Sequence, residues 1–423
     1  MGIQRKEQGG WGLTFLDLFA GIGGFRWGLE QSGHTCVGHV EIDVHAHRSY
    51  MAMYGLCPCP EKTEGDKNIS WLYHKEGENN GEKEENCNRL PAEWYAKDIK
   101  RLTAGQIPSA EIWTFGFPCT DISVSGRMAG LHGARSGLFF EVARLLKGTG
   151  AENKPRYLLI ENVKHLLSCN GGRDFTTVLT ELWEAGYGCE WCVVNSKDFG
   201  VPQHRERVYL VGYLGGGSGR KLFPVRRTDF APVEGSTEGT WKGQSGCTSF
   251  VDMSRGARFT QQARSVMAKQ NAGVTNHKGE TSGVFFCKGH PDCAMAVLSP
   301  NRMEKRQNGR RIKGVGEPGF TLTCQDRHGI LLGCFGEGKA DALSCCRIRR
   351  LTPRECWRLQ AFDDFLFDRA EAAGTSDTQL YKQAGNAVTV NIVYEIGKRL
   401  SEMEEDRKQL TACQEGRGIK TEI

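Results

Sequence analysis

The chain has 423 residues, 39% of them hydrophobic and 25% charged, with a formal net charge of +5. This composition is typical of a globular protein with room for two domains, and it excludes collagen-like and strongly disordered chains. No run of about 18 uncharged apolar residues occurs, so we expect no membrane span, and the polar N-terminus lacks a signal-peptide core. Seventeen scattered cysteines, an odd number, argue against a disulfide framework. We therefore expect a cytoplasmic protein.

The beginning of the chain alternates between strand-like and helix-like patterns. These predict a strand over 13–20, a glycine turn over 21–24, a helix over 25–33, a strand over 36–43 and a helix over 45–55. The order strand, helix, strand is typical of an α/β domain. We therefore predict a doubly wound, mainly parallel sheet of the Rossmann-like kind.

Segment 57–92 interrupts this alternation because it is polar, charged and only weakly periodic. We expect it to form a surface insertion. Its Cys57, Cys59, His74 and Cys87 raise the alternative of a zinc site, but the C-x-C spacing is not the usual C-x₂-C and no second close pair follows. We expect no metal site.

The α/β pattern returns and then gives way to a different composition. Strands are predicted over 157–163 and 205–214, and a helix over 175–187. The glycine-rich stretch 215–221 is typical of a flexible joint, and the basic, irregular sequence after it predicts a smaller second domain. We expect a first domain over 1–214, a second over 215–375 organised by a helix at 352–362, and a segment over 376–423 that returns to the first. The tail after 400 is polar, and we expect it to fray.

The first glycine turn is a candidate ligand site. Glycines between a strand and a helix allow a ligand close to the backbone. Glu41 ends the next strand, where an acidic side chain suits the two hydroxyls of a ribose. The pattern of Phe19, Gly21, Gly23 and Gly24 favours a nucleoside, although a purely structural glycine turn fits nearly as well.

Cys119 stands where a reactive thiol is expected. It follows Pro118 directly after a short apolar run, outside the carboxyl end of a predicted strand, where α/β sheets bind ligands. A thiolate is a nucleophile when its surroundings lower its pKa. Most of the other cysteines are expected to be small buried hydrophobes; Cys189 and Cys192 form a CxxC, but strand alternation points them to opposite faces.

Three more side chains complete a set of chemical groups. Glu161 ends the strand 157–163, where partial burial would help it share a proton, with the capping of a following helix as the alternative. Arg205 and Arg207 alternate along the next strand, so we expect them on one face, suited to a ring carbonyl and a phosphate.

These motifs together resemble one family. The chain order Phe-Ala-Gly-Ile-Gly-Gly (19–24), Gly-Phe-Pro-Cys (116–119), Glu-Asn-Val (161–163), Gln-His-Arg-Glu-Arg (203–207), the segment 349–362 and Gln-Ala-Gly-Asn-Ala-Val (383–388) is similar to that of the S-adenosylmethionine-dependent DNA (cytosine-5) methyltransferases. The likeness covers most of 13–213 and 347–399. The middle region 215–346 stands where that family has its target-recognition region.

The resemblance implies a mechanism and its residues. Cys119 would attack cytosine C6, Glu161 would bind N3 and the amine, Arg205 would bind O2, and Arg207 would support the site. The family's positions for S-adenosylmethionine fall on Phe19, Gly21, Gly23, Glu41, Ile42, Asp98, Ile99, Pro118, Leu138, Asn386 and Val388. The flipped-out base would be enclosed by the loop 120–137, and DNA contacts are expected at Ser123, Ser125, Arg127, Arg135, Arg310 and Arg311.

The partner implied is double-stranded DNA, bound by a monomer. A restriction-modification system with a separately acting endonuclease, a solitary host enzyme and a phage enzyme all fit the sequence. Three other functions remain as alternatives: an RNA methyltransferase of the same fold, a catalytically inactive nucleic-acid-binding protein, and a nucleotide-dependent oxidoreductase. The oxidoreductase would explain the glycine turn but not Cys119, Glu161 and Arg205 together.

Overall fold

The architecture is taken from a computed structural model. It describes residues 12–58, 68–74, 93–118, 131, 133, 137–216, 222–225 and 351–415, with side chains as far as 409, together with the backbone of short strands between 250 and 350. Within this part of the chain, every helix is too short or too polar to span a bilayer.

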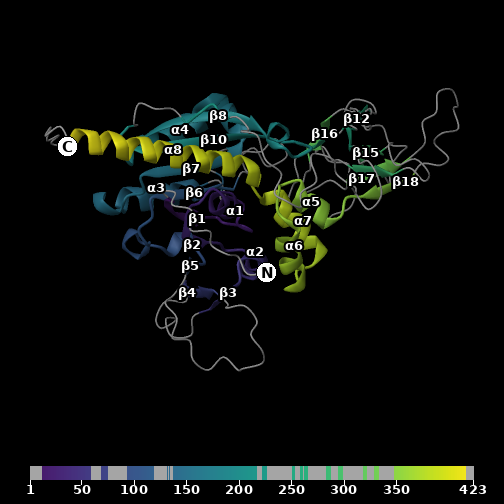
Figure 1. Ribbon diagram of the computed structural model, residues 1–423, viewed down its shortest axis with the longest axis horizontal. Coiled ribbons are helices and arrows are strands. Elements are labelled where there is room, and N and C mark those ends of the chain that lie inside the picture. The colour runs from purple at the N-terminus through teal and green to yellow at the C-terminus, as the bar shows by residue number, and fades with distance from the viewer. Residues whose placement is uncertain are drawn as a thin grey trace.

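A nine-stranded mixed sheet forms the centre of the described part of the chain (Figure 1). Its strand order is β3-β4-β5-β2-β1-β6-β7-β10-β8. The five strands from β5 to β7 run parallel, and the two strands at each edge pair antiparallel. The strands are β1 (Thr14–Leu18), β2 (Thr35–Val40), β3 (Leu56–Pro58), β4 (Ile69–His74), β5 (Glu93–Ala96), β6 (Ile112–Phe115), β7 (Tyr157–Val163), β8 (Tyr187–Asn195) and β10 (Glu206–Leu214).

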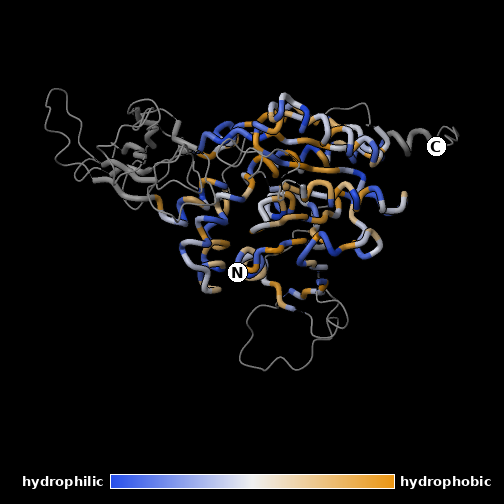
Figure 2. Tube along the Cα trace, turned by 180° about the vertical axis from the view of Figure 1, so that it is seen from behind, coloured by the Kyte–Doolittle hydropathy of each residue, from blue (hydrophilic) through white to orange (hydrophobic). Residues whose placement is uncertain are grey.

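Helices cover both faces of this sheet, as the predicted doubly wound fold requires. Strand β1 shows why: Leu16 packs with α3 and α4 on one face, whereas Phe15 packs with α1 and α8 on the other. A strand buried on both faces is mostly apolar, as the Phe-Leu pair of β1 is, and Figure 2 shows apolar segments concentrated in the middle of the molecule. The helices are α1 (Gly24–Gln31), α2 (Val44–Met53), α3 (Leu138–Gly148), α4 (Arg173–Glu184), α5 (Pro353–Arg358), α6 (Asp364–Ala372), α7 (Asp377–Asn386) and α8 (Val390–Glu415).

The segment expected to be a surface insertion contributes two strands to the sheet. β3 and β4 form an antiparallel pair that extends the sheet beyond β5. Leu72 and Tyr73 in β4 are buried, so this part of the segment expected as a surface insertion belongs to the sheet. The short apolar stretch of β4 is hard to recognise in the sequence because polar residues surround it, but it pairs with β5. Residues 59–67 and 75–92 lie outside the described part.

The long C-terminal helix α8 lies beside α1 (Figure 1). Gly28 of α1 and Val393 of α8 are in close contact, and His34 Nε2 lies 2.9 Å from the Gly397 carbonyl oxygen. Helix α8 therefore packs against α1 of the sheet domain. The expected fraying after 400 is wrong as far as Glu415, because Met403 and Glu404 are buried along this helix.

Short strands between 250 and 350 form two further sheets. One has the order β12-β11-β14-β18-β17-β15, and the other has the order β16-β13-β9. In the second sheet β9 (Gln203–His204), directly before β10, pairs in parallel with β13, so the two parts of the chain are joined through the backbone. The other strands are β11 (Phe250–Asp252), β12 (Arg258–Thr260), β13 (Gln262–Arg264), β14 (Gly283–Phe286), β15 (Ala294–Leu298), β16 (Pro318–Thr321), β17 (His328–Leu332) and β18 (Arg347–Arg350).

Helices α5, α6 and α7 pack against the sheet domain as well. Trp357, Leu366 and Leu380 share one buried cluster with Tyr50 and Met53 of α2. The segment 351–375 therefore contributes to the same core as α2. The domain boundaries expected from composition stay a prediction.

Candidate active site

The turn after β1 has the backbone geometry of a ligand-binding corner. Phe19 and Gly21 adopt positive φ angles of 56° and 57°, a region that favours glycine and is strained for a residue such as Phe19. A methyl group added to Gly21 would meet no atom within 4 Å, whereas one on Gly23 would lie 2.6 Å from the Tyr54 hydroxyl. Gly21 therefore borders open space, and Gly23 is needed for packing.

Glu41 lies directly beside this turn. Its Oε2 accepts a 2.7 Å hydrogen bond from the Gly21 amide, and its Oε1 accepts one of 2.7 Å from the Asp43 amide. Burial raises the pKa of Glu41. The carboxylate is held in one orientation at the carboxyl end of β2, as binding a ribose requires.

The neighbouring positions expected to hold a nucleoside come together at the same corner. Ile42 is 59% exposed, so it leaves an apolar surface next to Glu41. Asp98 follows β5, the neighbour of β2, and its carboxylate accepts a hydrogen bond from the Lys100 amide. Ile99 is only 3% exposed, so its side chain belongs to the core.

The turn between α7 and α8 reaches this corner from the far end of the chain. Val388 is 7% exposed, and a methyl group on Gly24 would lie 2.7 Å from its Cγ2. Asn386, two residues earlier, is exposed. The structure thus brings Val388 to the first glycine turn, with Asn386 two residues before it in the same turn.

The carboxyl ends of β6 and β7 form the second half of the site. These strands are parallel neighbours, with Phe115 opposite Ile160. A methyl group on Gly116 would lie 3.4 Å from Glu161 Oε2, and Asn162 Nδ2 donates a 3.1 Å hydrogen bond to the Phe117 carbonyl oxygen. The backbone that leads to position 119 is therefore fixed beside Glu161. Asn162 is not among the residues expected at the site, although its place next to a strand-end carboxylate was a signal in the sequence.

The two arginines of 203–207 have different partners. Arg207 Nε lies 3.0 Å from Glu161 Oε1, and both side chains keep some exposure, 14% and 12%. Arg205 is buried, and its Nη2 lies 2.9 Å from the Ala387 carbonyl oxygen. The expectation that the pair alternates along one strand is wrong, because the strand is interrupted at Arg205 between β9 and β10. The structure therefore brings Arg207, rather than Arg205, to Glu161.

The remaining expected positions are placed only in part. Pro118 is the last described residue before Cys119, and Leu138 begins α3. Cys119, Ser123, Ser125, Arg127, Arg135, Arg310 and Arg311 lie outside the described residues. Cys189 and Cys192 pack into clusters on opposite faces of the sheet, which confirms the expectation for this CxxC.

The comparison with known families narrows the functions that the sequence left open. A family model described as C-5 cytosine-specific DNA methylase matches residues 13–75 and 84–402. The chain belongs to this family. It is therefore a DNA cytosine methyltransferase, and the inactive-binder and oxidoreductase alternatives lose their support.

Individual relatives match this methyltransferase over nearly its whole length. The orphan methyltransferase M.SPBetaI of Bacillus phage SPbeta is 29% identical over 478 residues, covering 92% of this chain and 97% of the relative. The type II methyltransferase M.HhaI of Haemophilus parahaemolyticus is 27% identical over 409 residues, covering 94% and 98%. Among solved structures, Dnmt2 of S. pombe is similar in fold, with a TM-score of 0.53 at 16% identity over 92% of this chain and 99% of that one.

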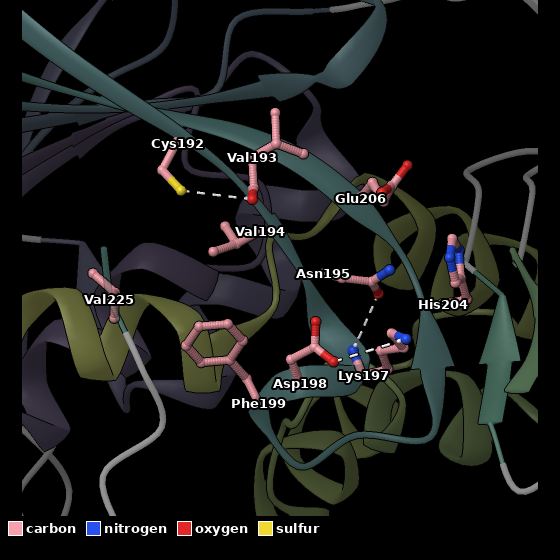
Figure 3. A pocket seen from close by; sticks show the side chains of 10 residues that line it. All are labelled: Cys192, Val193, Val194, Asn195, Lys197, Asp198, Phe199, His204, Glu206 and Val225. Carbon is pink, nitrogen blue, oxygen red and sulfur yellow. Dashed lines mark hydrogen bonds and ion pairs between the residues drawn. The ribbon is translucent and has the colours of Figure 1, made fainter. Parts of the chain in front are cut away.

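A pocket of about 560 Å³ lies between β8, β9 and the start of β10 (Figure 3). Val194 and Phe199 form an apolar side, and Asp198, His204 and Glu206 lie around them. None of the described residues expected at the methyltransferase site lines this pocket. This pocket therefore does not mark the methyltransferase site.

Proposed function

We propose that this methyltransferase moves a methyl group from S-adenosylmethionine to C5 of a cytosine flipped out of a specific duplex DNA sequence. Cys119 would form a covalent bond to C6 of that ring. The observation that supports this most directly is the pair of Glu161 and Arg207, at the carboxyl end of β7, beside the fixed backbone of 116–118.

The cofactor residues fit a nucleoside. Glu41 offers a fixed carboxylate for ribose hydroxyls, Ile42 an apolar surface for an adenine ring, and Gly21 open space at the backbone. Phe19, Gly23, Asp98, Ile99, Pro118, Leu138, Asn386 and Val388 complete the proposed shell. When bound, S-adenosylmethionine supplies an electrophilic methyl group on a sulfonium.

The chain's own side chains would activate the base. Cytosine C5 is a weak nucleophile. Addition of the Cys119 thiolate to C6 moves the electrons of the C5–C6 double bond onto C5 and the adjoining ring atoms, which makes C5 nucleophilic. Glu161 binds N3 and the exocyclic amine, and Arg207 donates to O2, so both stabilise the charge that develops. The geometry favours Arg207 for O2, because Arg205 is turned toward α7 and α8.

The remaining steps restore the ring. The nucleophilic C5 takes the methyl group, a base removes the C5 proton, and the electrons left on C5 expel the Cys119 thiolate from C6. The target carbon is inaccessible in a stacked duplex, so the base must leave the helix at a cost of about a few kcal/mol. We propose that the loop 120–137 closes behind it and that the basic segment 301–314 contacts phosphates, which makes binding salt-dependent.

The decisive test offers the purified protein methyl-labelled S-adenosylmethionine with equal amounts of duplex genomic DNA and total tRNA. Digestion and mass spectrometry then identify the methylated nucleoside. We expect 5-methyldeoxycytidine, and sequencing of the modified sites gives the target sequence. 5-Methylcytidine alone would assign the protein to RNA methylation, and no product with either would contradict the proposal.

A variant separates the covalent mechanism from simple binding. Cys119→Ser should lose methyl transfer and still bind S-adenosylmethionine. Duplex DNA that contains 5-fluorodeoxycytidine should trap wild-type protein as a covalent complex, because fluorine at C5 cannot leave as a proton does, and Cys119→Ser should form none. Near-normal turnover by the serine variant would rule out Cys119 as the nucleophile.

A further inference from the structure

The turn between α7 and α8 exposes a single side chain within an otherwise buried run. Residues 383–390 are all buried except Asn386. Val388 of this run contacts Gly24 at the start of α1, which places the turn against the proposed cofactor corner. Asn386 is thus the one side chain of residues 383–390 that a ligand at this corner could contact.

Side chains from two other segments hold the carbonyl oxygens of this turn. Gln360 Nε2 donates to the Ala384 carbonyl at 2.8 Å. Arg205 Nη2 lies 2.9 Å from the Ala387 carbonyl and 3.5 Å from the Gly385 carbonyl. The last carbonyls of a helix have no partner within the helix, and a cation there also interacts favourably with the helix dipole. One guanidinium therefore contacts the residues on both sides of Asn386.

Arg205 is itself fixed by the sheet. Its amide donates a 3.0 Å hydrogen bond to Asn195 Oδ1, and its carbonyl accepts one of 2.9 Å from the Ser196 amide. Ser196 Oγ lies 2.7 Å from Thr389 Oγ1 in the same turn. Arg205 thus joins the turn to the end of β8: its side chain contacts the turn, and its backbone is hydrogen-bonded to Asn195 and Ser196.

We propose that Arg205 is a positioning residue for the cofactor: it holds the turn that presents Asn386 to S-adenosylmethionine, while Arg207 serves the target base. The inference rests on the proposed function, which places the cofactor at this corner. The short segment 205–207 then connects the two halves of the site: Arg205 contacts the turn at the cofactor corner, and Arg207 contacts Glu161 at the end of β7.

The test compares equilibrium binding of S-adenosylmethionine, measured by calorimetry without DNA, in wild-type protein and in Arg205→Met, Arg205→Lys, Asn386→Ala and Arg207→Met variants. Arg205→Met and Asn386→Ala should each raise Kd by roughly tenfold to a hundredfold, the loss that accompanies a charged hydrogen bond. Arg205→Lys should be intermediate, since an ammonium group reaches fewer carbonyls at once. Arg207→Met, the matched control, should keep the wild-type Kd and lose methyl transfer.

A double variant, Arg205→Met with Asn386→Ala, tests whether the arginine acts through the asparagine. Its Kd should be no higher than that of the weaker-binding single variant, because both changes remove the same contact. Multiplication of the two single effects would overturn the inference, as would wild-type Kd in Arg205→Met or in Asn386→Ala. If wild-type protein itself fails to bind the cofactor, the proposed function fails first.

Folding of each variant is followed by circular dichroism and thermal unfolding. If Arg205→Met does not fold, Arg205→Lys carries the comparison, since it keeps a buried cation near both carbonyl groups. A folded Arg205→Lys protein with wild-type Kd but reduced methyl transfer would assign Arg205 to the target base and overturn the inference.

Discussion

Asp17 is a carboxyl group buried at the centre of the sheet. It lies in β1, is 0% exposed, and accepts a 2.9 Å hydrogen bond from the Thr114 hydroxyl through Oδ1. Among the described residues its Oδ2 has no hydrogen-bond partner. Burial raises the pKa of Asp17 from 3.8 to about 7, against the opposing effect of the Thr114 hydroxyl.

This shift predicts a change in stability with pH. Because the folded state holds the Asp17 proton more tightly than the unfolded chain, wild-type protein loses stability as pH rises from about 4 to 7. Asp17→Asn removes this loss, so its free energy of unfolding relative to wild type should rise by about 2 kcal/mol between pH 5 and pH 8. Urea denaturation at both pH values measures it. Asp198→Asn, on a side chain 61% exposed, is the control. An equal change in the free energy of unfolding with pH for Asp17→Asn and wild type would contradict the prediction.

At the scale of elements, the closest packing joins α1 to α8. A methyl group on Gly28 would lie 2.6 Å from Val393 Cβ and 2.8 Å from the Val390 carbonyl oxygen. Distances this short leave no room for a larger residue unless one helix moves. The glycine is therefore required by the neighbouring helix rather than by its own backbone.

Gly28→Ala should lower the free energy of unfolding by about 1–3 kcal/mol, the usual cost of overpacking. The gain in helix propensity, about 1 kcal/mol, offsets only part of this. Thermal unfolding measures the difference. Gly105→Ala is the matched control, because a methyl group there would meet nothing within 4 Å. An unchanged melting temperature in Gly28→Ala would mean that α8 does not lie against α1.

At the scale of the whole molecule, Glu404 joins the middle of α8 to the sheet. Its side chain is 0% exposed and accepts hydrogen bonds of 2.6 Å from both Arg156 and Tyr157, next to and within β7. Burial alone would raise the pKa of Glu404, but hydrogen bonds from Arg407, Tyr157 and Arg156 lower it to about 2. The ionised form is thus the stabilising one.

Glu404→Gln should cost about 2–3 kcal/mol of unfolding free energy at pH 7. A lowered folded-state pKa gives stability that is present above about 4.5 and is lost as pH falls toward 2, so the deficit of the variant should shrink by more than half by pH 3. Chemical denaturation at pH 7, 4 and 3 measures this. Glu402→Gln, half-exposed and 3.8 Å from Arg399, should show no such trend, and a deficit independent of pH would contradict the assignment.

Local pattern predicted much of this arrangement. The strand expected over 157–163 is observed as Tyr157–Val163, and the helix expected over 25–33 is observed as Gly24–Gln31. The strand is a continuous apolar run, and the helix lies between a glycine turn and Gly33. The corner of Gly21 and Glu41 followed from turn chemistry and strand order.

The features that the sequence did not predict depend on contacts with residues far away in the chain. β4 pairs with β5 across a polar segment, so composition alone concealed it. The orientation of Arg205 depends on carbonyl groups 180 and 182 residues away, and alternation along a strand cannot anticipate a break in that strand. Glu404 and Met403 are buried because α8 lies on the sheet, which a polar tail did not indicate.

The contact between Gly28 and α8 also has a consequence for synthesis on the ribosome. The residues that cover this face of α1 begin at Val390, near the end of translation. At about 5–20 residues per second, the ribosome needs roughly 20–70 s to extend the chain from Gly28 to Val390. During that time α1 lacks its covering helix, so the nascent sheet carries an uncovered apolar face that chaperones and neighbouring chains can reach.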